Sequence, residues 1–168
     1  VYSNTSDAPD TQDRTISIAV SDNGVENNES NIITSTTIKV TAVNDAPILK
    51  EGNVAAKANI NISKNIAENT EQIITIAELI DGKYADVDSE NVGIAVSAVS
   101  GVSTFSYSTD NGNSWQNATA STIKATNSLF LSSDAQIKFT SPSKDKIIKI
   151  TSKLWDESNK TTSSLSKY

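Results

Sequence analysis

Short runs in which apolar and polar residues alternate recur along the chain, and most of these runs stop at a turn signal. The run RTISIAV at 14–20 shows the pattern clearly, because Ile16, Ile18 and Val20 stand at every second position and Asp-Asn-Gly follows shortly after. Alternation with period two is typical of a strand that buries one face, and Asp-Asn-Gly is a strong turn signal. The chain is therefore predicted to be an antiparallel all-β protein.

Strands at regular, turn-separated intervals are typical of a sandwich of two sheets. One segment is ambiguous, since Ile74, Ala77 and Leu79 within 71–80 could share a helical face, but its β-branched residues favour a strand that runs into a short turn. The predicted strands lie at 13–20, 32–43, 58–64, 72–77, 92–100, 103–109, 114–118, 128–131, 135–140 and 146–154.

A domain boundary is predicted near residue 46. Pro47 cannot donate a ladder hydrogen bond and restricts Ala46 to extended geometry, so the segment NDAP ends a strand and begins a linker. Two strands do not make a stable domain. Residues 1–45 are therefore interpreted as the C-terminal strands of a preceding repeat, and residues 46–168 as a second repeat.

A similarity between two segments of the chain supports this repeat organisation. DRTISIAVSDNG at 13–24 and DKIIKITSKLWDES at 145–158 share an acid, a base, alternating isoleucines and then an aspartate at a turn, so Asp22 and Asp156 are predicted to be equivalent. Only TTSSLSKY at 161–168 then remains where the second domain would have its last strand. The second domain could lack that strand, and both ends of the chain would then fall inside repeats.

The composition argues against most kinds of enzyme. The chain has no cysteine and no histidine, which excludes disulfides, thiolate metal sites and imidazole catalysis. Its serines lack an ordinary base, and its six glycines form no phosphate-binding pattern. Paired acids for glycoside hydrolysis cannot be singled out among so many acidic residues. We expect a protein that is not an enzyme.

The net charge of the chain limits the kinds of molecule that it can bind. Asp and Glu exceed Lys and Arg by 20 to 14, for a net charge of −6, which argues against binding a nucleic-acid backbone. No run approaches the roughly 20 apolar residues needed to span a bilayer. The acidic excess instead makes bound hard cations one candidate source of stability.

The segment VTAVNDAPIL at 40–49 resembles the linker of cadherin repeats, D-x-N-D-N-A-P-x-F, and more closely the A-V-N-D-A-P junction of repeats in giant secreted, RTX-type bacterial adhesins. Three further segments are similar to motifs of that family, in the family's order: VSDNG at 20–24, IAEN at 66–69 and ADVDSEN at 85–91. Two longer segments are similar to a variant of the repeats in those bacterial proteins: GIAVSAVSGVSTFSYSTDNGNSW at 93–115 and LFLSSDAQIKFTSP at 129–142.

This resemblance implies a Greek-key β-sandwich, cadherin-like or immunoglobulin-like, in a partial tandem repeat. It implies an extracellular location at a bacterial surface, where the repeat is a structural spacer in an adhesin. The expected partners are neighbouring repeats or copies of the chain, with host or surface glycans and proteins bound through other domains. Two alternatives stay open: a carbohydrate-binding module that uses an exposed aromatic ring in the 105–115 hairpin, and a filament subunit in which strand 32–43 completes the next copy.

Calcium at the junction of repeats is also implied, and the chain supplies oxygens for it. Asp86 and Asp88 stand two apart, so in an extended segment both carboxylates would project to one side and could hold an ion that wants six to eight oxygen ligands. The alternative is a solvated acidic turn, and an EF-hand is excluded because Asn91 stands where that loop needs glycine. The linker also departs from the cadherin consensus at Ala42. The predicted ligands are Asp22, Asn44, Asp45, Glu68, Asp86 and Asp88.

The segment YSTDNGNSW at 107–115 has the spacing S-x-D-x-G-x-x-W of the Asp-box hairpin known from sialidases. Sialidases repeat this hairpin and bind substrate with three arginines, whereas here it occurs once and Arg14 is the only arginine. It is therefore predicted to be a structural hairpin in which Asp110 accepts backbone N–H bonds and Gly112 has a positive φ. The hairpin residues are Tyr107, Ser108, Asp110, Gly112 and Trp115, with Tyr107 and Trp115 on the flanking strands. Trp115 and Trp155 are predicted to fill the core between the sheets.

Overall fold

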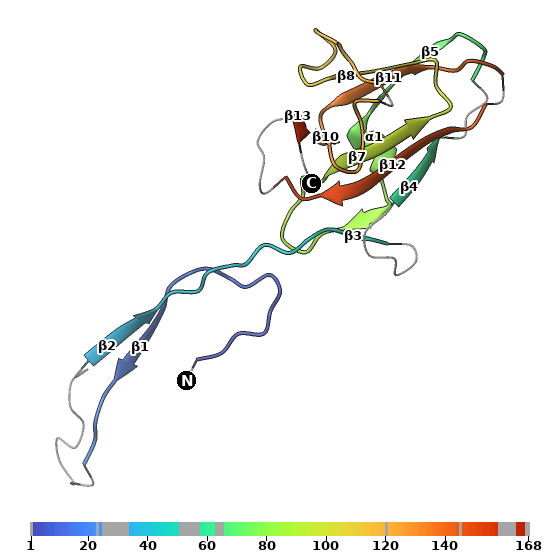
Figure 1. Ribbon diagram of the computed structural model, residues 1–168. Helices are drawn as coiled ribbons and strands as arrows, with labels where there is room; N and C mark the ends of the chain where they lie inside the picture. Colours follow the sequence, from blue (N-terminus) through green and yellow to red (C-terminus); the bar gives the residue numbers. More distant parts are fainter. Residues whose placement is uncertain are drawn as a thin grey trace. The chain divides into compact units, whose positions relative to one another are not determined.

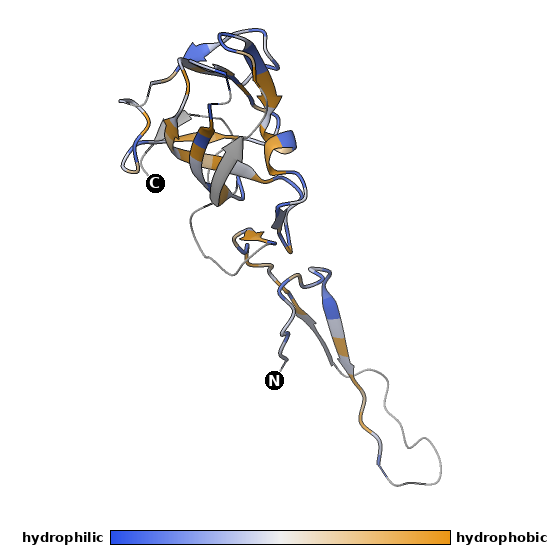
Figure 2. Ribbon diagram, turned by 90° about the vertical axis from the view of Figure 1, so that its right-hand side faces the viewer, coloured by the Kyte–Doolittle hydropathy of each residue, from blue (hydrophilic) through white to orange (hydrophobic). Residues whose placement is uncertain are grey.

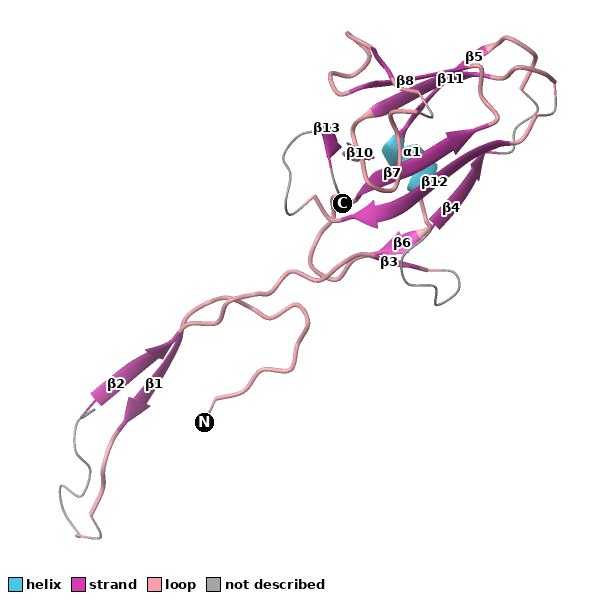
Figure 3. Ribbon diagram, in the orientation of Figure 1, coloured by secondary structure: helices cyan, strands magenta, loops and turns pink. Residues whose placement is uncertain are grey.

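The computed structural model describes residues 2–22, 24, 34–50, 58–62, 66–119, 121–144, 146–157 and 164–166. Within these residues the chain consists of strands, turns and one five-residue helix, so the predicted all-β class is confirmed (Figure 3). The strands are β1 Arg14–Ile18, β2 Thr34–Ile38, β3 Ile48–Leu49, β4 Ala58–Ile62, β5 Glu71–Thr75, β6 Tyr84–Ala85, β7 Gly93–Ser100, β8 Thr104–Ser108, β9 Gln116–Asn117, β10 Ser128–Leu131, β11 Gln136–Thr140, β12 Ile148–Trp155 and β13 Ser164–Ser166, and the helix is α1 Ile76–Ile80.

The chain divides into two compact units, Val1–Asn44 and Asp45–Tyr168. In the first unit β1 and β2 pair antiparallel, with Arg14 opposite Ile38 and Ile18 opposite Thr34 (Figure 1). The long connection between these strands lies mostly outside the described residues. The first unit is therefore seen as a single two-stranded sheet.

The second unit contains two larger antiparallel sheets. One has the strand order β13-β10-β7-β12-β4 and the other the order β5-β11-β8-β9, while β3 and β6 form a small separate pair (Figure 1). β13 falls within the segment 161–168 that was predicted to stand in the place of the last strand, and it pairs with β10. Strands from both large sheets share one buried cluster, which gives the unit a sandwich-like core. The Greek-key connection stays a prediction.

The core lies between the inner faces of the two sheets, and its hydrophobic strands can be followed in Figure 2. Phe139 on β11 stands directly opposite Phe105 on β8, and both are buried. The five-stranded sheet contributes a facing set of fully or almost fully buried aliphatic side chains: Ile94, Val96, Leu129, Leu131, Ile148 and Ile150. Alternate residues of each strand therefore meet across the sandwich, as the period-two pattern predicts.

A second, smaller cluster contains Ala95, Phe130 and Trp155. The rings of Phe130 and Trp155 meet edge to face, with centroids 5.1 Å apart. Ala95 lies between two residues of the main core on β7, so this cluster occupies the outer face of the five-stranded sheet. Trp155 is buried, as predicted, but the predicted place between the sheets is wrong.

The ambiguous segment 71–80 contains both predicted structures in succession. β5 ends at Thr75, whose hydroxyl accepts the Glu78 N–H at 3.1 Å, while the Glu78 carboxylate accepts the Thr75 N–H at 2.9 Å. This reciprocal capping box starts α1 at Ile76. The strand prediction is confirmed for 71–75, and the helical alternative describes 76–80.

Candidate functional site

The acidic loop, residues 86–91, follows β6 and receives the first residue of the second unit. The Asp45 N–H donates to Oδ2 of Asp88 at 2.9 Å, although 43 positions separate the two residues. β3 then pairs with β6, placing Ile48 opposite Ala85, and the Lys50 N–H bonds to the Lys83 carbonyl at 3.0 Å. The start of the unit is therefore bonded to the acidic loop through Asp45 and to the preceding segment 83–85 through β3 and Lys50.

Asp86 organises this loop. Its Oδ1 accepts the N–H groups of Asp88 and Ser89, both at 3.2 Å, so one carboxylate oxygen shapes the turn. Its Oδ2 is buried and finds no hydrogen-bond partner among the described residues. A buried carboxylate oxygen without a partner is costly, because the water that it loses is not replaced.

The environment of Asp86 disfavours its charge. Burial of the carboxyl group and the neighbouring Asp88 carboxylate raise the pKa of Asp86 above its usual value, against the lowering effect of the two N–H bonds. A cation placed beside Asp86 and Asp88 would reverse this balance, since it would replace the lost hydration and offset the repulsion. The donor chemistry of this pair therefore suits a hard divalent cation.

The other predicted ligands are distributed unevenly. Asp45, Asp86 and Asp88 are brought together through the hydrogen bonds of the acidic loop. Glu68 lies before β5, where the next residue, Asn69, bonds to the carbonyl of Ser141. β5 and α1 separate it in sequence from Asp86, and no described contact brings it to the loop.

Asp22 and Asn44 belong to the first unit. Asp22 closes a turn there by accepting the Gly24 N–H at 2.8 Å. Among the described residues, no group of three or more acidic, histidine or cysteine side chains is arranged to hold a metal ion. Any ion at the acidic loop would therefore need backbone, amide or water oxygens in addition to the two carboxylates.

The turn of the Asp-box hairpin is built as the sequence predicts, and Tyr107 lies on β8, but Trp115 stands just before β9 and not on a strand. Asp110 Oδ1 accepts the Ser114 N–H at 2.8 Å, and its Oδ2 accepts the Ser114 hydroxyl at 2.6 Å. The Ser108 hydroxyl donates to Asp110 at 2.7 Å. Gly112 has φ +85°, and Asn111 before it, a residue that the sequence analysis did not single out, has φ +57°. These bonds make Asp110 the centre of the turn.

Lowering the pH is expected to loosen this hairpin. The two bonds from Ser114 and the bond from the Ser108 hydroxyl lower the pKa of Asp110 to about 2. Because an unfolded aspartate titrates near pH ~3.9, the stabilisation is fully present above about pH 4 and is lost as the pH falls through about 2. Amide resonances of Ser114 followed by NMR through this range would show the transition.

Asp110→Asn is the matched test of that pH dependence, since the amide keeps one acceptor oxygen but cannot titrate. We expect the acid transition of the Ser114 amide to disappear in this variant. Asp134→Asn, in another exposed turn, is expected to leave it unchanged. An unchanged acid transition in Asp110→Asn would contradict the assignment.

Trp115 does not lie in the core, so that prediction is wrong. Its side chain is half-buried, and the Lys138 ammonium lies 4.4 Å from the centroid of its ring. Lys138 also contacts Glu71 at 3.5 Å. Because Lys138 comes from β11, far along the chain, no local signal could predict this cation–π contact. A sugar stacked on this ring face would have to displace the ammonium group.

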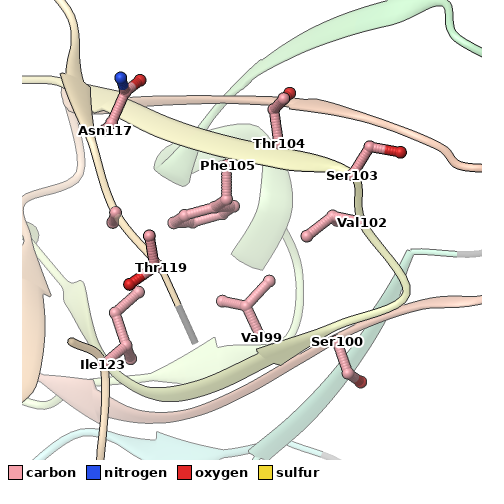
Figure 4. A pocket seen from close by; sticks show the side chains of 10 residues that line it. Val99, Ser100, Val102, Ser103, Thr104, Phe105, Asn117, Thr119 and Ile123 are labelled. Atoms are coloured by element: carbon pink, nitrogen blue, oxygen red, sulfur yellow. The ribbon is translucent and has the colours of Figure 1, made fainter. Parts of the chain in front are cut away.

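A cavity of about 620 Å³ opens between the β7–β8 turn and the segment that follows β9 (Figure 4). Phe105, Val99 and Ile123 supply buried apolar walls, while hydroxyl and amide groups such as those of Thr104 and Asn117 line its rim. The described lining residues carry no charge. The cavity contains none of the predicted site residues and is separate from the acidic loop in the sequence.

Comparisons of the chain with protein-family models, with curated proteins and with solved structures find no match. Within the described ranges, none of the helical structure has the length and apolar character required to cross a membrane.

Proposed function

We propose that the chain is a structural repeat of a bacterial cell-surface or secreted adhesin, stiffened by calcium at the acidic loop. The residues that support this function are the family-like segments VTAVNDAPIL and ADVDSEN, which meet in the second unit through the Asp45–Asp88 hydrogen bond. A spacer repeat holds other domains of its protein away from the cell. A spacer functions through its stiffness. The acidic loop affects this stiffness because it holds Asp45, the first residue of the second unit.

The single observation that carries the calcium proposal is the buried, unpartnered Oδ2 of Asp86 beside the carboxylate that holds Asp45. Calcium would supply a charge that both carboxylates can share. Oδ1 of Asp86 would still accept the N–H groups that form the turn, and Asp88 would still accept the Asp45 N–H. The acidic loop, and with it the first residues of the unit, would lose freedom of movement.

Calcium is expected to raise the melting temperature of the second unit. Extracellular modules bind with dissociation constants of about 10⁻⁴–10⁻³ M. An ion that binds only the folded state at about 10 mM would then add roughly 1.4–2.7 kcal/mol to the free energy of unfolding. Calorimetric melts with calcium, with equimolar magnesium and with a chelator would measure the shift and separate it from ionic strength.

Asp86→Asn gives this experiment a two-sided outcome. The pKa of Asp86 is higher in the folded state than in the unfolded state, so the protonated carboxyl stabilises the fold. This stabilisation is fully present below the unfolded pKa and is lost as the pH rises through the folded pKa. At neutral pH the charged carboxylate therefore costs stability, and the neutral amide should raise the melting temperature in chelator. The same variant should abolish the calcium shift, while Asp134→Asn should retain it. No calcium shift in the unmodified chain, or an equal shift in Asp86→Asn, would reject the calcium proposal.

Completion of the sheet by a strand from another copy is the less favoured mechanism. The sequence motivates it through a missing last strand, but β13 lies beside β10 at that edge of the five-stranded sheet. Sugar binding on Trp115 is likewise less favoured, because Lys138 lies over the ring. The spacer proposal requires neither a donated strand nor an open aromatic face.

A further inference from the structure

Asparagine and glycine, Asn111 and Gly112, stand together at the tip of the Asp-box hairpin. Both have positive φ, +57° and +85°, and the Asn113 N–H bonds to the Asp110 carbonyl at 3.3 Å. Two left-handed central residues closed by such a bond make a type I′ turn, in which the first of them has a ψ of roughly +30°. The tip of the hairpin is therefore a type I′ turn made by an asparagine followed by a glycine.

An asparagine followed by a glycine can lose its side-chain amide, because glycine has no side chain to shield its backbone nitrogen. The Gly112 nitrogen gives up its proton to the solvent and forms a bond to Cγ of Asn111. The bond between Cγ and Nδ2 then breaks, and the amide group takes up a proton and leaves as ammonia. Water opens the resulting succinimide ring at one carbonyl or the other, which gives aspartate or isoaspartate. A flexible chain with this pair would lose the Asn111 amide by this route.

The type I′ turn holds the two reacting groups apart. Ring closure needs the Asn111 side chain and the Gly112 nitrogen on the same side of the bond between Cα and the carbonyl carbon of Asn111. With the left-handed backbone of this turn, the side chain and the nitrogen lie on nearly opposite sides of that bond. The hairpin must therefore open before the ring can form.

Two hydrogen bonds fix this unreactive arrangement. The Gly112 N–H donates to the Ser108 hydroxyl at 2.8 Å, so the nitrogen that would attack is engaged. The side-chain oxygen of Asn111 accepts a hydrogen bond from Nε2 of Gln136 at 3.1 Å. Ser108 belongs to β8 and Gln136 to β11, which lie side by side in the smaller sheet (Figure 1). The attacking nitrogen and the attacked side chain are thus each held by a strand of the sheet.

We propose that Asn111 is a latent deamidation site, which the closed Asp-box turn protects and which reacts when the hairpin opens. Isoaspartate continues the chain through its side-chain carbonyl, so the backbone gains one methylene group. The short turn between Asp110 and Asn113 does not accommodate this longer residue. A hairpin that reacts while open therefore does not recover its original turn. The proposal goes beyond the spacer function and depends on neither that function nor calcium.

The rate of deamidation in the full 168-residue chain tests this protection. The chain is incubated at one mildly alkaline pH, and mass spectrometry of the tryptic fragment 84–124 locates the change at Asn111. The reference is a synthetic peptide of residues 105–118, because an isolated hairpin of two strands is not stably folded. We expect Asn111 to react about 100-fold more slowly in the chain, as suits a hairpin that is open in about 1% of molecules.

Ser108→Ala removes the acceptor of the Gly112 N–H and should raise the rate at Asn111 by roughly tenfold. Gln136→Met removes the donor that holds the Asn111 side chain and should also raise the rate. Thr109→Ala is the matched control in the same hairpin, because Thr109 is exposed and its side chain makes no hydrogen bond within the described part of the chain. Its rate should equal that of the unmodified chain.

Tryptophan fluorescence would check that each variant stays folded, and Gln136→Met keeps the test open if Ser108→Ala does not fold. Equal rates in the chain and the peptide would overturn the proposal, as would an unchanged rate in every folded variant of Ser108 and Gln136. Asn127, which precedes Ser128 elsewhere in the second unit, reports opening of the whole unit. An equal acceleration at Asn127 would show that global unfolding and not the hairpin controls the reaction, and would also overturn the proposal.

Discussion

Phe139→Ala is expected to lower the free energy of unfolding of the second unit by about 3–5 kcal/mol. Phe139 is only 2% exposed, and it stands opposite Phe105 on the inner face of the smaller sheet. Alanine would remove the ring from the centre of the sandwich and leave a cavity that the paired strands cannot close. Domains are stable by only about 5–15 kcal/mol, so the loss would be a large part of the total.

Urea or thermal unfolding followed by tryptophan fluorescence would measure this loss, with an expected fall in melting temperature of about 10 °C or more. Ile73→Ala is the control on the same sheet, because Ile73 stands opposite Lys138 on the outer face and is more than half exposed. Its effect should stay within about 1 kcal/mol. Equal effects of the two substitutions would mean that the two sheets do not enclose the core described here.

Gly93→Ala is the second substitution with a large expected effect. A Cβ atom at Gly93 would clash with the Leu131 carbonyl oxygen and lie 3.1 Å from Cε3 of Trp155. β7 lies between β10 and β12 in the sheet, so the strand cannot move away from one neighbour without approaching the other. We expect a loss of about 3 kcal/mol, at the upper end of typical overpacking costs.

Gly82→Ala separates this steric effect from backbone strain. Gly82 has φ +68°, and a Cβ there would meet no atom within 4 Å, so only the cost of a left-handed alanine remains, about 1 kcal/mol. Chemical denaturation of both variants should rank Gly93→Ala as clearly the more damaging. The reverse ranking would contradict the close approach of β7 and β10.

The strands were predictable because alternation is local. The predicted strand 128–131 coincides with β10, and the predicted strand 135–140 differs from β11 by one residue. The two tryptophans were not predictable, because a side chain's burial depends on strands far away in the sequence. Trp155 packs on the outer face through Phe130, and Trp115 is met by Lys138 from another strand.

The acidic loop was predictable in part for the same reason. Asp86 and Asp88 are two positions apart, so they are near each other in any local geometry. The predicted extended segment is wrong, because Asp86 accepts the Asp88 N–H in a turn, which is the alternative that the sequence left open. The bond from Asp45 to Asp88 spans 43 positions and was not predicted; only the nearness of the two residues was expected, as members of one ligand set implied by the resemblance to a repeat junction. Glu68 was included among the predicted ligands because of the short motif IAEN. Such a motif does not say where in the fold its residues lie, and the structure places Glu68 before β5.

The bond between Asp45 and Asp88 has a mechanical consequence. Tension applied through the linker enters the second unit at Asp45, so this bond and the two-residue pair β3–β6 carry load before the long strands β7 and β12. Rupture of these contacts and of the Lys50–Lys83 backbone bond would release residues 45–50, about 20 Å when extended, while the sandwich core stays folded. The start of the unit would thus act as an extensible tether, and an ion at the acidic loop would set the force at which it opens.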